Sequence, residues 1–204
     1  MARYLGSKCK VCRRLGESVC GSAKCALLRR NTPPGMHGTK GRPRLTGYGI
    51  QLHEKQKAKA TYGVLERQFR TYYEKAKAKR GKTGEYMLVT LERRFDNVIY
   101  RAGLASTRRQ ARQLVSHGQF IVNGKNVNIP SFQINKGDSI TVKTNKAKNT
   151  YWSEVSKNTS SSQEIPAWIS VDRKKCEIKI QELPTTELIQ STINMNLIIE
   201  LYSL

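Results

Sequence analysis

The stretch Thr107-Arg-Arg-Gln-Ala-Arg-Gln-Leu-Val-Ser-His-Gly118, followed shortly by Asn123-Gly124, says most about the fold of this chain. Thr107 is a good helix N-cap, and Gly118 suits the residue that follows a helix. Asn-Gly is the pair that a type I′ hairpin turn favours, because both of its residues take a positive φ. We therefore expect a short capped helix over 107–117 and then a tight hairpin.

The two faces of this predicted helix differ in chemistry. Helical spacing puts three apolar residues on one side and three arginines on the other, namely Ala111, Leu114 and Val115 against Arg108, Arg109 and Arg112. The chain has 204 residues and a net charge of +22. A face of arginines in such a chain is how a folded module binds a phosphate backbone, so the motif favours RNA binding over catalysis.

The positive charge is concentrated in the first 143 residues. Residues 1–90 hold 21 Lys/Arg against 5 Asp/Glu, residues 91–143 hold 9 against 3, and residues 144–204 hold 7 against 7. A basic but merely solvated surface does not need this asymmetry. A polyanionic partner accounts for it, because each neutralised phosphate releases counterions.

The length allows one large or two small domains with a real core. No apolar run approaches the roughly 20 residues of a membrane span. The first residues lack the apolar segment of a secretory signal, so we expect the chain to stay in the compartment where it is made.

Helical periodicity runs from residue 48 to residue 102 and predicts three helices, over about 48–62, 65–80 and 86–102. Their aromatic residues are interpreted as core and not as base-stacking platforms. Strands are predicted at 120–122, 127–129, 139–143, 168–171 and 177–180. The polar segment 145–163 is interpreted as a linker or one loose helix, and the apolar end 197–202 must dock on something, as helix or strand.

Two closely spaced cysteine pairs, Cys9-x2-Cys12 and Cys20-x4-Cys25, predict a four-cysteine structural zinc site. Metal binding would supply folding energy that this apolar-poor arm lacks. Free thiols, disulfides and an iron–sulfur cluster are the alternatives; the absence of a signal peptide disfavours disulfides, and an iron–sulfur cluster would have no redox partner here. Cys176, alone on a predicted strand, is interpreted as a small core residue.

Several motifs occur together in an order that is typical of one family. They are Met1-Ala-Arg-Tyr4, the early cysteines, Arg29-Arg30-x3-Pro34-Gly35-x-His37-Gly38, Glu54-Lys-Gln-Lys57, Tyr62-Gly63-x2-Glu66-Arg-Gln-Phe-Arg70, Leu91-Glu92-x-Arg94-x-Asp96-Asn97-Val98-x-Tyr100-Arg101, the opening motif, and Ile199-Glu-Leu-Tyr-Ser203. Over nearly its whole length the chain resembles bacterial-type small ribosomal subunit protein four (S-four).

The resemblance implies an α+β fold: a helical domain with a zinc-binding N-terminal arm, plus an inserted RNA-binding module of two helices, a hairpin and a small antiparallel sheet. It places the arm at 1–47 and the helical rRNA-binding domain at 48–90, completed by the tail at about 190–204. The second domain would cover 91–189, with the RNA-binding module at 91–143 and a linker plus hairpin at 144–189.

The resemblance also implies a function. Family members are non-catalytic primary binders of the 5′ domain of 16S-type rRNA, which nucleate assembly of the small-subunit body. They line the mRNA entry tunnel, contact protein five, support translational accuracy, and in some cases bind their own mRNA to autoregulate. The implied location is the ribosome of the cytoplasm, or an organellar ribosome of bacterial type, with no membrane and no small-molecule substrate.

The cationic residues of the matching motifs and of the arm are the predicted RNA contacts. They are Arg3, Arg13, Arg14, Arg29, Arg30, His37, Lys40 and Arg42 in the arm; Lys55, Lys57, Arg67 and Arg70 in the helical domain; and Arg93, Arg94, Arg108, Arg109, Arg112 and His117 in the module. His37 is interpreted as an RNA or packing contact and not as a fifth metal ligand. The predicted metal ligands are Cys9, Cys12, Cys20 and Cys25, although the gap between the two pairs is shorter than in zinc-containing relatives and many relatives lack the cysteines.

Two other classes of protein share some of these features. An RNA-modifying enzyme would need a separate catalytic domain, for which the chain has little length and only three aspartates, Asp96, Asp138 and Asp172. A zinc-containing DNA-binding regulator fits the charge and the cysteines, but its recognition helix would not be short and followed by a hairpin.

Overall fold

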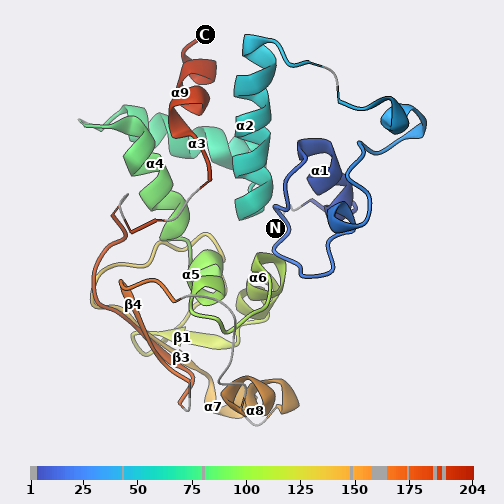
Figure 1. Ribbon diagram of the computed structural model, residues 1–204. Coiled ribbons are helices and arrows are strands. Elements are labelled where there is room, and N and C mark those ends of the chain that lie inside the picture. Colours follow the sequence, from blue (N-terminus) through green and yellow to red (C-terminus); the bar gives the residue numbers. More distant parts are fainter. Residues whose placement is uncertain are drawn as a thin grey trace. The chain divides into compact units, whose positions relative to one another are not determined.

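A computed structural model describes residues 4–42, 44–79, 81–147, 149–157, 165–173, 175–185, 188–189 and 192–204. The chain divides into two compact units (Figure 1). Unit 1 comprises Met1–Met87 with Ser191–Leu204, and unit 2 comprises Leu88–Gln190. Helices in both units and one small antiparallel sheet in unit 2 confirm the mixed helix-and-sheet composition that the sequence predicts.

Unit 1 is helical. Its elements are α1 (Lys8–Leu15), the short 3-10 turns η1 (Ala26–Leu28) and η2 (Met36–Lys40), α2 (Gly47–Tyr62), α3 (Glu66–Lys77) and α9 (Met195–Ser203), and α4 (Thr83–Glu92) leads from unit 1 into unit 2. The Thr46 hydroxyl caps α2 by accepting from the Gly49 N–H at 3.2 Å, and Gly63 ends the helix at φ +63°. Local sequence signals therefore set both ends of α2.

Helix α9 gives the apolar end of the chain its docking surface. It packs against α2 (Figure 1), with Ile198 fully buried and the Tyr202 ring stacked on Tyr73 at 4.6 Å between centroids. A Cβ at Gly84 would lie only 3.1 Å from Ile199 and Met195, so the small residue lets α9 approach α4 closely. The helix thus closes the core of unit 1 from the far end of the sequence.

Unit 2 combines helices with a five-stranded sheet. Its helices are α5 (Phe95–Arg101), α6 (Arg108–Ser116), α7 (Thr144–Ala147) and α8 (Thr150–Lys157). The strands are β1 (Phe120–Val122), β2 (Lys125–Asn126), β3 (Ser139–Val142), β4 (Ile169–Asp172) and β5 (Glu177–Ile180), in the antiparallel order β2-β1-β3-β5-β4.

The sheet matches the sequence patterns in most respects. The pairing of Val122 with Lys125 encloses Asn123 and Gly124, at φ +48° and +77°, as the predicted tight hairpin requires. The return strand β2 is nevertheless two residues long and precedes the predicted 127–129, so that part of the prediction is wrong. The second predicted hairpin is present as β4 and β5.

Residues 144–147 and 150–157 are helical and are not part of a linker. They form α7 and α8, and Trp152 packs edge-to-face on Phe120, whose ring also contacts Phe95. The Trp152 indole N–H donates to the side chain of Gln119 at 2.9 Å. One buried aromatic residue therefore anchors this part of the chain to the core, while Lys148 and residues 158–163 of the predicted linker lie outside the described residues.

The predicted single helix 86–102 is wrong, because α4 and α5 are separated at Arg93-Arg94. Arg94 is extended (ψ 136°) and forms an isolated antiparallel bridge with Gln133. The Ile134 N–H donates to the Arg93 carbonyl at 3.0 Å, and the Phe95 N–H donates to the Phe132 carbonyl at 2.9 Å. These long-range backbone hydrogen bonds outweigh the local helix preference, and neither glycine nor proline marks the break.

Candidate nucleic-acid interface and cysteine cluster

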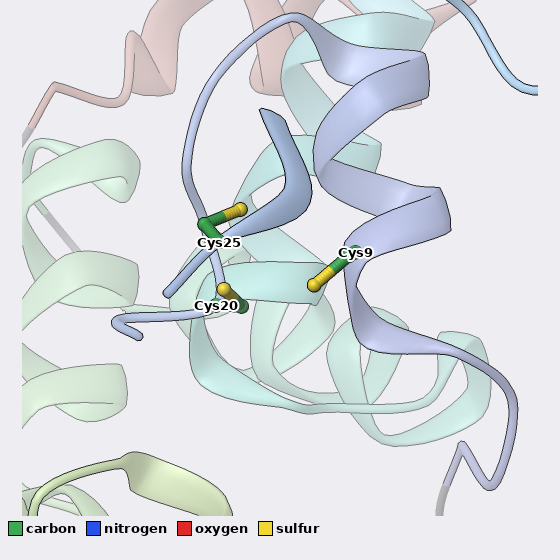
Figure 2. A group of neighbouring side chains, drawn as sticks. All are labelled: Cys9, Cys20 and Cys25. Carbon is green, nitrogen blue, oxygen red and sulfur yellow. The ribbon is translucent and has the colours of Figure 1, made fainter. Parts of the chain in front are cut away.

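Three of the four predicted metal ligands lie together in unit 1. Cys9 is on α1, while Cys20 and Cys25 come from the loop that follows this helix. Their sulfur atoms lie within 4.8 Å of one another, and Figure 2 shows them turned toward one shared space. Tetrahedral zinc with bonds of about 2.3 Å needs sulfurs roughly 3.8 Å apart, so a small contraction of this group would suit the ion.

Cys12 lies outside this tight group of three but next to it. It is fully buried one turn after Cys9 on α1, and the neighbouring thiols of Cys20 and Cys25 both raise its pKa. Burial, followed by the hydrogen bond with Cys20, raises the pKa of Cys12 to about 12. All four predicted cysteines therefore gather in one place, with the thiol of Cys12 the hardest to ionise.

Cys25 has the opposite character. Burial raises its pKa, but hydrogen bonds from the Leu27 backbone and the Ser18 side chain, together with those from Cys20 and Cys12, outweigh burial and lower the pKa to about 7. The thiolate is the form in which cysteine binds a metal, and Cys25 reaches that form near neutral pH. The donor set is therefore chemically suited to zinc.

The arm around the cysteines is held by its own arginines. Arg13 donates to the backbone carbonyls of Thr32 and Pro33 at 3.0 and 3.1 Å. Arg42 donates to the carbonyl of Arg13 at 3.3 Å and to Asn31 at 3.1 Å. These two predicted RNA contacts therefore also organise the arm. The remaining described members of the predicted set in the arm are exposed, namely Arg14, Arg29, Arg30, His37 and Lys40, and Arg3 lies outside the described residues.

The helices of unit 1 present some of their predicted cations and bury one. Arg67 and Arg70 are exposed on α3. Lys57 is buried: its ammonium lies 2.7 Å from Glu17 and donates to the Thr192 carbonyl at 2.8 Å. The prediction that Lys57 contacts RNA is corrected, because an enclosed ammonium with these partners serves the packing of unit 1.

Glu66 is the centre of a second group in unit 1. It accepts from Lys55 at 3.0 Å, from Lys59, and from the Tyr202 hydroxyl at 2.8 Å. Partial burial raises its pKa, but these three hydrogen bonds dominate and lower it to about 2. Burial and the hydrogen bond to Glu66 raise the pKa of Tyr202. Lys55, a predicted RNA contact, is therefore also tied to the contact between α3 and α9.

Helix α6 is capped as its sequence predicts. The Thr107 hydroxyl accepts from the Gln110 N–H at 3.3 Å. The Gln110 side chain accepts from the N–H of Ser106, one residue before the N-cap, at 2.9 Å. Ala111 and Val115 are fully buried on the inner face of the helix. The predicted buried face of α6 is therefore confirmed.

The three arginines of α6 differ more than the sequence suggests. Arg109 is exposed, as is His117 after the helix. Arg108 donates to Asn97 at 2.8 Å and lies over the Tyr100 ring, and Arg112 lies 3.6 Å from Asp96 with only 12% of its side chain exposed. Arg109 is therefore the exposed member of the three, whereas the other two lie along polar groups of α5.

Arg94 and Arg93 flank the break between α4 and α5. Arg94 is fully buried and forms two hydrogen bonds to Asp96, at 3.1 and 2.7 Å. The prediction that Arg94 contacts RNA is therefore corrected. Arg93 donates to the Ile134 carbonyl at 2.9 Å and to the Asn135 side chain.

Sequence reasoning did not assign a role to the acidic and amide partners of these arginines. Glu92 accepts from Arg101 at 3.1 and 2.8 Å, and Asp96 and Asn97 hold Arg94 and Arg108. The signal was the dense run of charged and amide residues between Leu91 and Arg101, which periodicity alone assigns to a helix surface.

No helix in the described part of the chain is both long enough and apolar enough to cross a membrane.

The chain matches two family descriptions in succession: a ribosomal protein S4/S9 N-terminal domain over residues 3–92 and an S4 domain over residues 93–140. Small ribosomal subunit protein uS4 of Cutibacterium acnes is 50% identical over 203 residues, and that of Acetivibrio thermocellus is 48% identical over 209. Both alignments cover the whole of this chain and of its relative, and uS4A of Alkaliphilus metalliredigens aligns in the same way at 46% identity. The chain therefore belongs to the small ribosomal subunit protein uS4 family.

Proposed function

We propose that the chain is a primary rRNA-binding protein of the small ribosomal subunit, which binds the 5′ domain of 16S-type rRNA directly and nucleates assembly of the body. Members of its family are ribosomal proteins and not enzymes, so the RNA-modifying alternative is set aside. One observation carries the proposal: most of the predicted RNA-contacting cations are exposed, and they lie in the first 143 residues, which hold the excess positive charge.

Each unit offers its own set of exposed cations. Unit 1 presents Arg14, Arg29, Arg30, Lys40, Arg42, Arg67 and Arg70. Unit 2 presents Arg109, with Arg108 and Arg112 alongside on α6 and the exposed side chain of His117 after the helix. Phosphate contacts of this kind fix the register of a protein on folded RNA and make affinity depend on salt.

The test compares equilibrium binding of two variants to a protein-free small-subunit rRNA transcript over a range of salt concentrations. Substituting Arg108, Arg109 and Arg112 together by alanine should weaken binding and reduce the salt slope by roughly 0.7–0.9 for each phosphate that is no longer neutralised. The matched control substitutes Lys146, Lys175 and Lys179, exposed lysines of the same unit in its charge-neutral part. If the two triple variants weakened binding equally, any exposed cation would contribute as much as the arginines of α6, and α6 would have no specific role in the interface.

Fragments of the rRNA test the finer assignment. A transcript of the 5′ domain should bind as tightly as the full rRNA, and one of another domain should compete only at low salt. A primary binder also stays on the small subunit through a high-salt wash. Binding that requires other ribosomal proteins to be present would contradict the assignment as a primary binder.

We also infer contacts beyond the rRNA: protein five as a neighbour that shares a role in translational accuracy, mRNA at the entry tunnel, and the chain's own mRNA as an autoregulatory target. Support for these comes from the family. Crosslinking within assembled subunits would test the neighbour and the tunnel contact. A competition between the rRNA transcript and the leader of the chain's own mRNA would test autoregulation.

The cysteine cluster supports a structural zinc site held by Cys9, Cys12, Cys20 and Cys25. A zinc ion there would cross-link α1 to the loop that follows it, in an arm with few buried apolar residues. Native mass spectrometry should show one zinc that is removed by chelation. Cys20→Ser should abolish zinc binding, whereas Cys176→Ala, a buried cysteine of unit 2, should retain it. A zinc-free mass at neutral pH in the presence of added zinc would reject the site.

A further inference from the structure

Three buried polar residues of unit 2 lie around the break between α4 and α5. Glu92, Asp96 and Asn97 are 1%, 3% and 2% exposed. Burying carboxylates and an amide is costly unless hydrogen-bond partners satisfy them. Here the partners include four arginines, Arg94, Arg101, Arg108 and Arg112. Four guanidinium groups against two carboxylates leave this network positively charged, and two of its arginines are on α6.

The Asn97 amide has one orientation in this network. Its Nδ2 donates to the Glu92 carboxylate at 2.6 Å and to the Glu92 backbone carbonyl at 3.0 Å. Both of these groups are acceptors only, so they require the donor side of the amide. The Asn97 Oδ1 therefore faces the other way and accepts from Arg108 Nε at 2.8 Å. Glu92 thus sets which atom Asn97 presents to α6.

A second contact fixes the plane of the same guanidinium. The Arg108 Cζ lies 4.4 Å from the centroid of the Tyr100 ring, which is partly buried against the core of unit 2. An arginine over an aromatic face is attracted by the ring quadrupole and loses rotational freedom. Arg108 is therefore held through Nε by an amide and through its face by a ring, before any ligand is present.

We propose that Asn97 and Tyr100 are positioning residues for RNA binding, which hold the Arg108 guanidinium in a set orientation at the surface of α6, with Glu92 orienting the Asn97 amide. The inference rests on the proposed function, since it takes Arg108 as a phosphate contact. An arginine that is already ordered gives up less rotamer freedom on binding, which is worth about three- to tenfold in affinity for one side chain.

A double-mutant cycle on the full chain tests this with a small-subunit rRNA transcript as the probe. Asn97→Ala should weaken binding about three- to tenfold, and the same substitution made in an Arg108→Ala background should have no further effect. The salt slope separates positioning from contact: Arg108→Ala should reduce it, whereas Asn97→Ala should leave it unchanged. Asn128→Ala, an exposed asparagine of the same unit, is the matched control and should match the parent chain.

Tyr100→Leu runs the same cycle with the apolar bulk retained, and it keeps the test decisive if Asn97→Ala does not fold. Additive reductions of affinity, with Asn97→Ala or Tyr100→Leu equally damaging when Arg108 is already absent, would overturn the positioning role. A parent-like affinity of Arg108→Ala alone would instead count against the proposed phosphate contact. The two failures are therefore distinguishable.

Discussion

The ion pair between Arg94 and Asp96 gives the strongest prediction for stability. Arg94 is fully buried and directs two hydrogen bonds at the Asp96 carboxylate. Asp96→Ala would leave a guanidinium in the core without its counter-charge, which costs about 3–5 kcal/mol when one partner of a buried pair is removed. For a unit of this size, with an m of about 2 kcal/mol/M, the urea midpoint should fall by about 2 M.

Tryptophan fluorescence is the appropriate assay, because both tryptophans of the chain, Trp152 and Trp168, are buried in unit 2. The unfolding transition they report is therefore that of the unit that contains the pair. Asp172→Ala, at an exposed aspartate on β4, is the control and should change the free energy of unfolding by less than about 1 kcal/mol.

Replacing both partners distinguishes the cost of an unpaired buried charge from the cost of lost packing around the pair. Arg94→Met with Asp96→Leu removes both charges and keeps apolar volume, so it should be clearly less destabilising than Asp96→Ala. Some cost should remain, because Asp96 also accepts from the Asn97 N–H at 3.0 Å. An Asp96→Ala variant destabilised by less than about 1 kcal/mol, or a double variant as damaging as the two single ones added together, would refute the reasoning.

Three further predictions concern unit 1. Because the pKa of Glu66 is lowered to about 2, its carboxylate stabilises the folded state above the ordinary pKa, and that contribution should disappear as pH falls from about 4.5 toward 2. Glu66→Gln should lower the free energy of unfolding by about 1 kcal/mol at pH 7, an amount discounted for the half-exposed Glu66 side chain. In melts followed by circular dichroism, the variant should also lose less stability than the parent chain as the pH falls through this range. An equal loss in the two proteins would contradict the role of Glu66. Lys57→Ala should destabilise unit 1 by about 2–3 kcal/mol while leaving the salt slope of rRNA binding unchanged, and a reduced slope would restore it as an RNA contact. A Cβ at Gly38 would lie 2.0 Å from the Pro33 carbonyl oxygen, so Gly38→Ala should make the arm more susceptible to limited proteolysis, whereas Gly47→Ala, with open space at its Cβ, should not; equal cleavage rates would count against the close approach.

Local signals predicted the elements that local chemistry determines. The Thr107 cap, the apolar face of α6 and the Asn123-Gly124 turn all depend on residues within a few positions of one another, and all three are present. The break after α4 depends instead on backbone hydrogen bonds to residues about 40 positions later, at 132–134. No residue near Arg94 in the sequence predicts these long-range hydrogen bonds.

The candidate interface was predictable as a set of charges but not residue by residue. Periodicity placed Arg108 and Arg112 on the face of α6 opposite its apolar residues, but it does not indicate that Asn97 and Asp96 of α5 would hold them. Lys57 has the same appearance in sequence as Lys55 and Lys59, which are only partly buried, and the return of the chain at Thr192 shows that it is enclosed. Burial of a cation is a long-range property, so a composition count overestimates the surface available to phosphate.

The contribution of α9 to unit 1 has a consequence for synthesis. The ribosome makes residues 88–190 between the two segments that form unit 1, so every strand of the described sheet emerges before α9 does. Until then Tyr73 lacks the Tyr202 ring that stacks on it, and the surface of α2 that receives α9 is uncovered. The nascent chain can therefore finish its second unit while the first is still open, and the synthesis of α9 then closes unit 1.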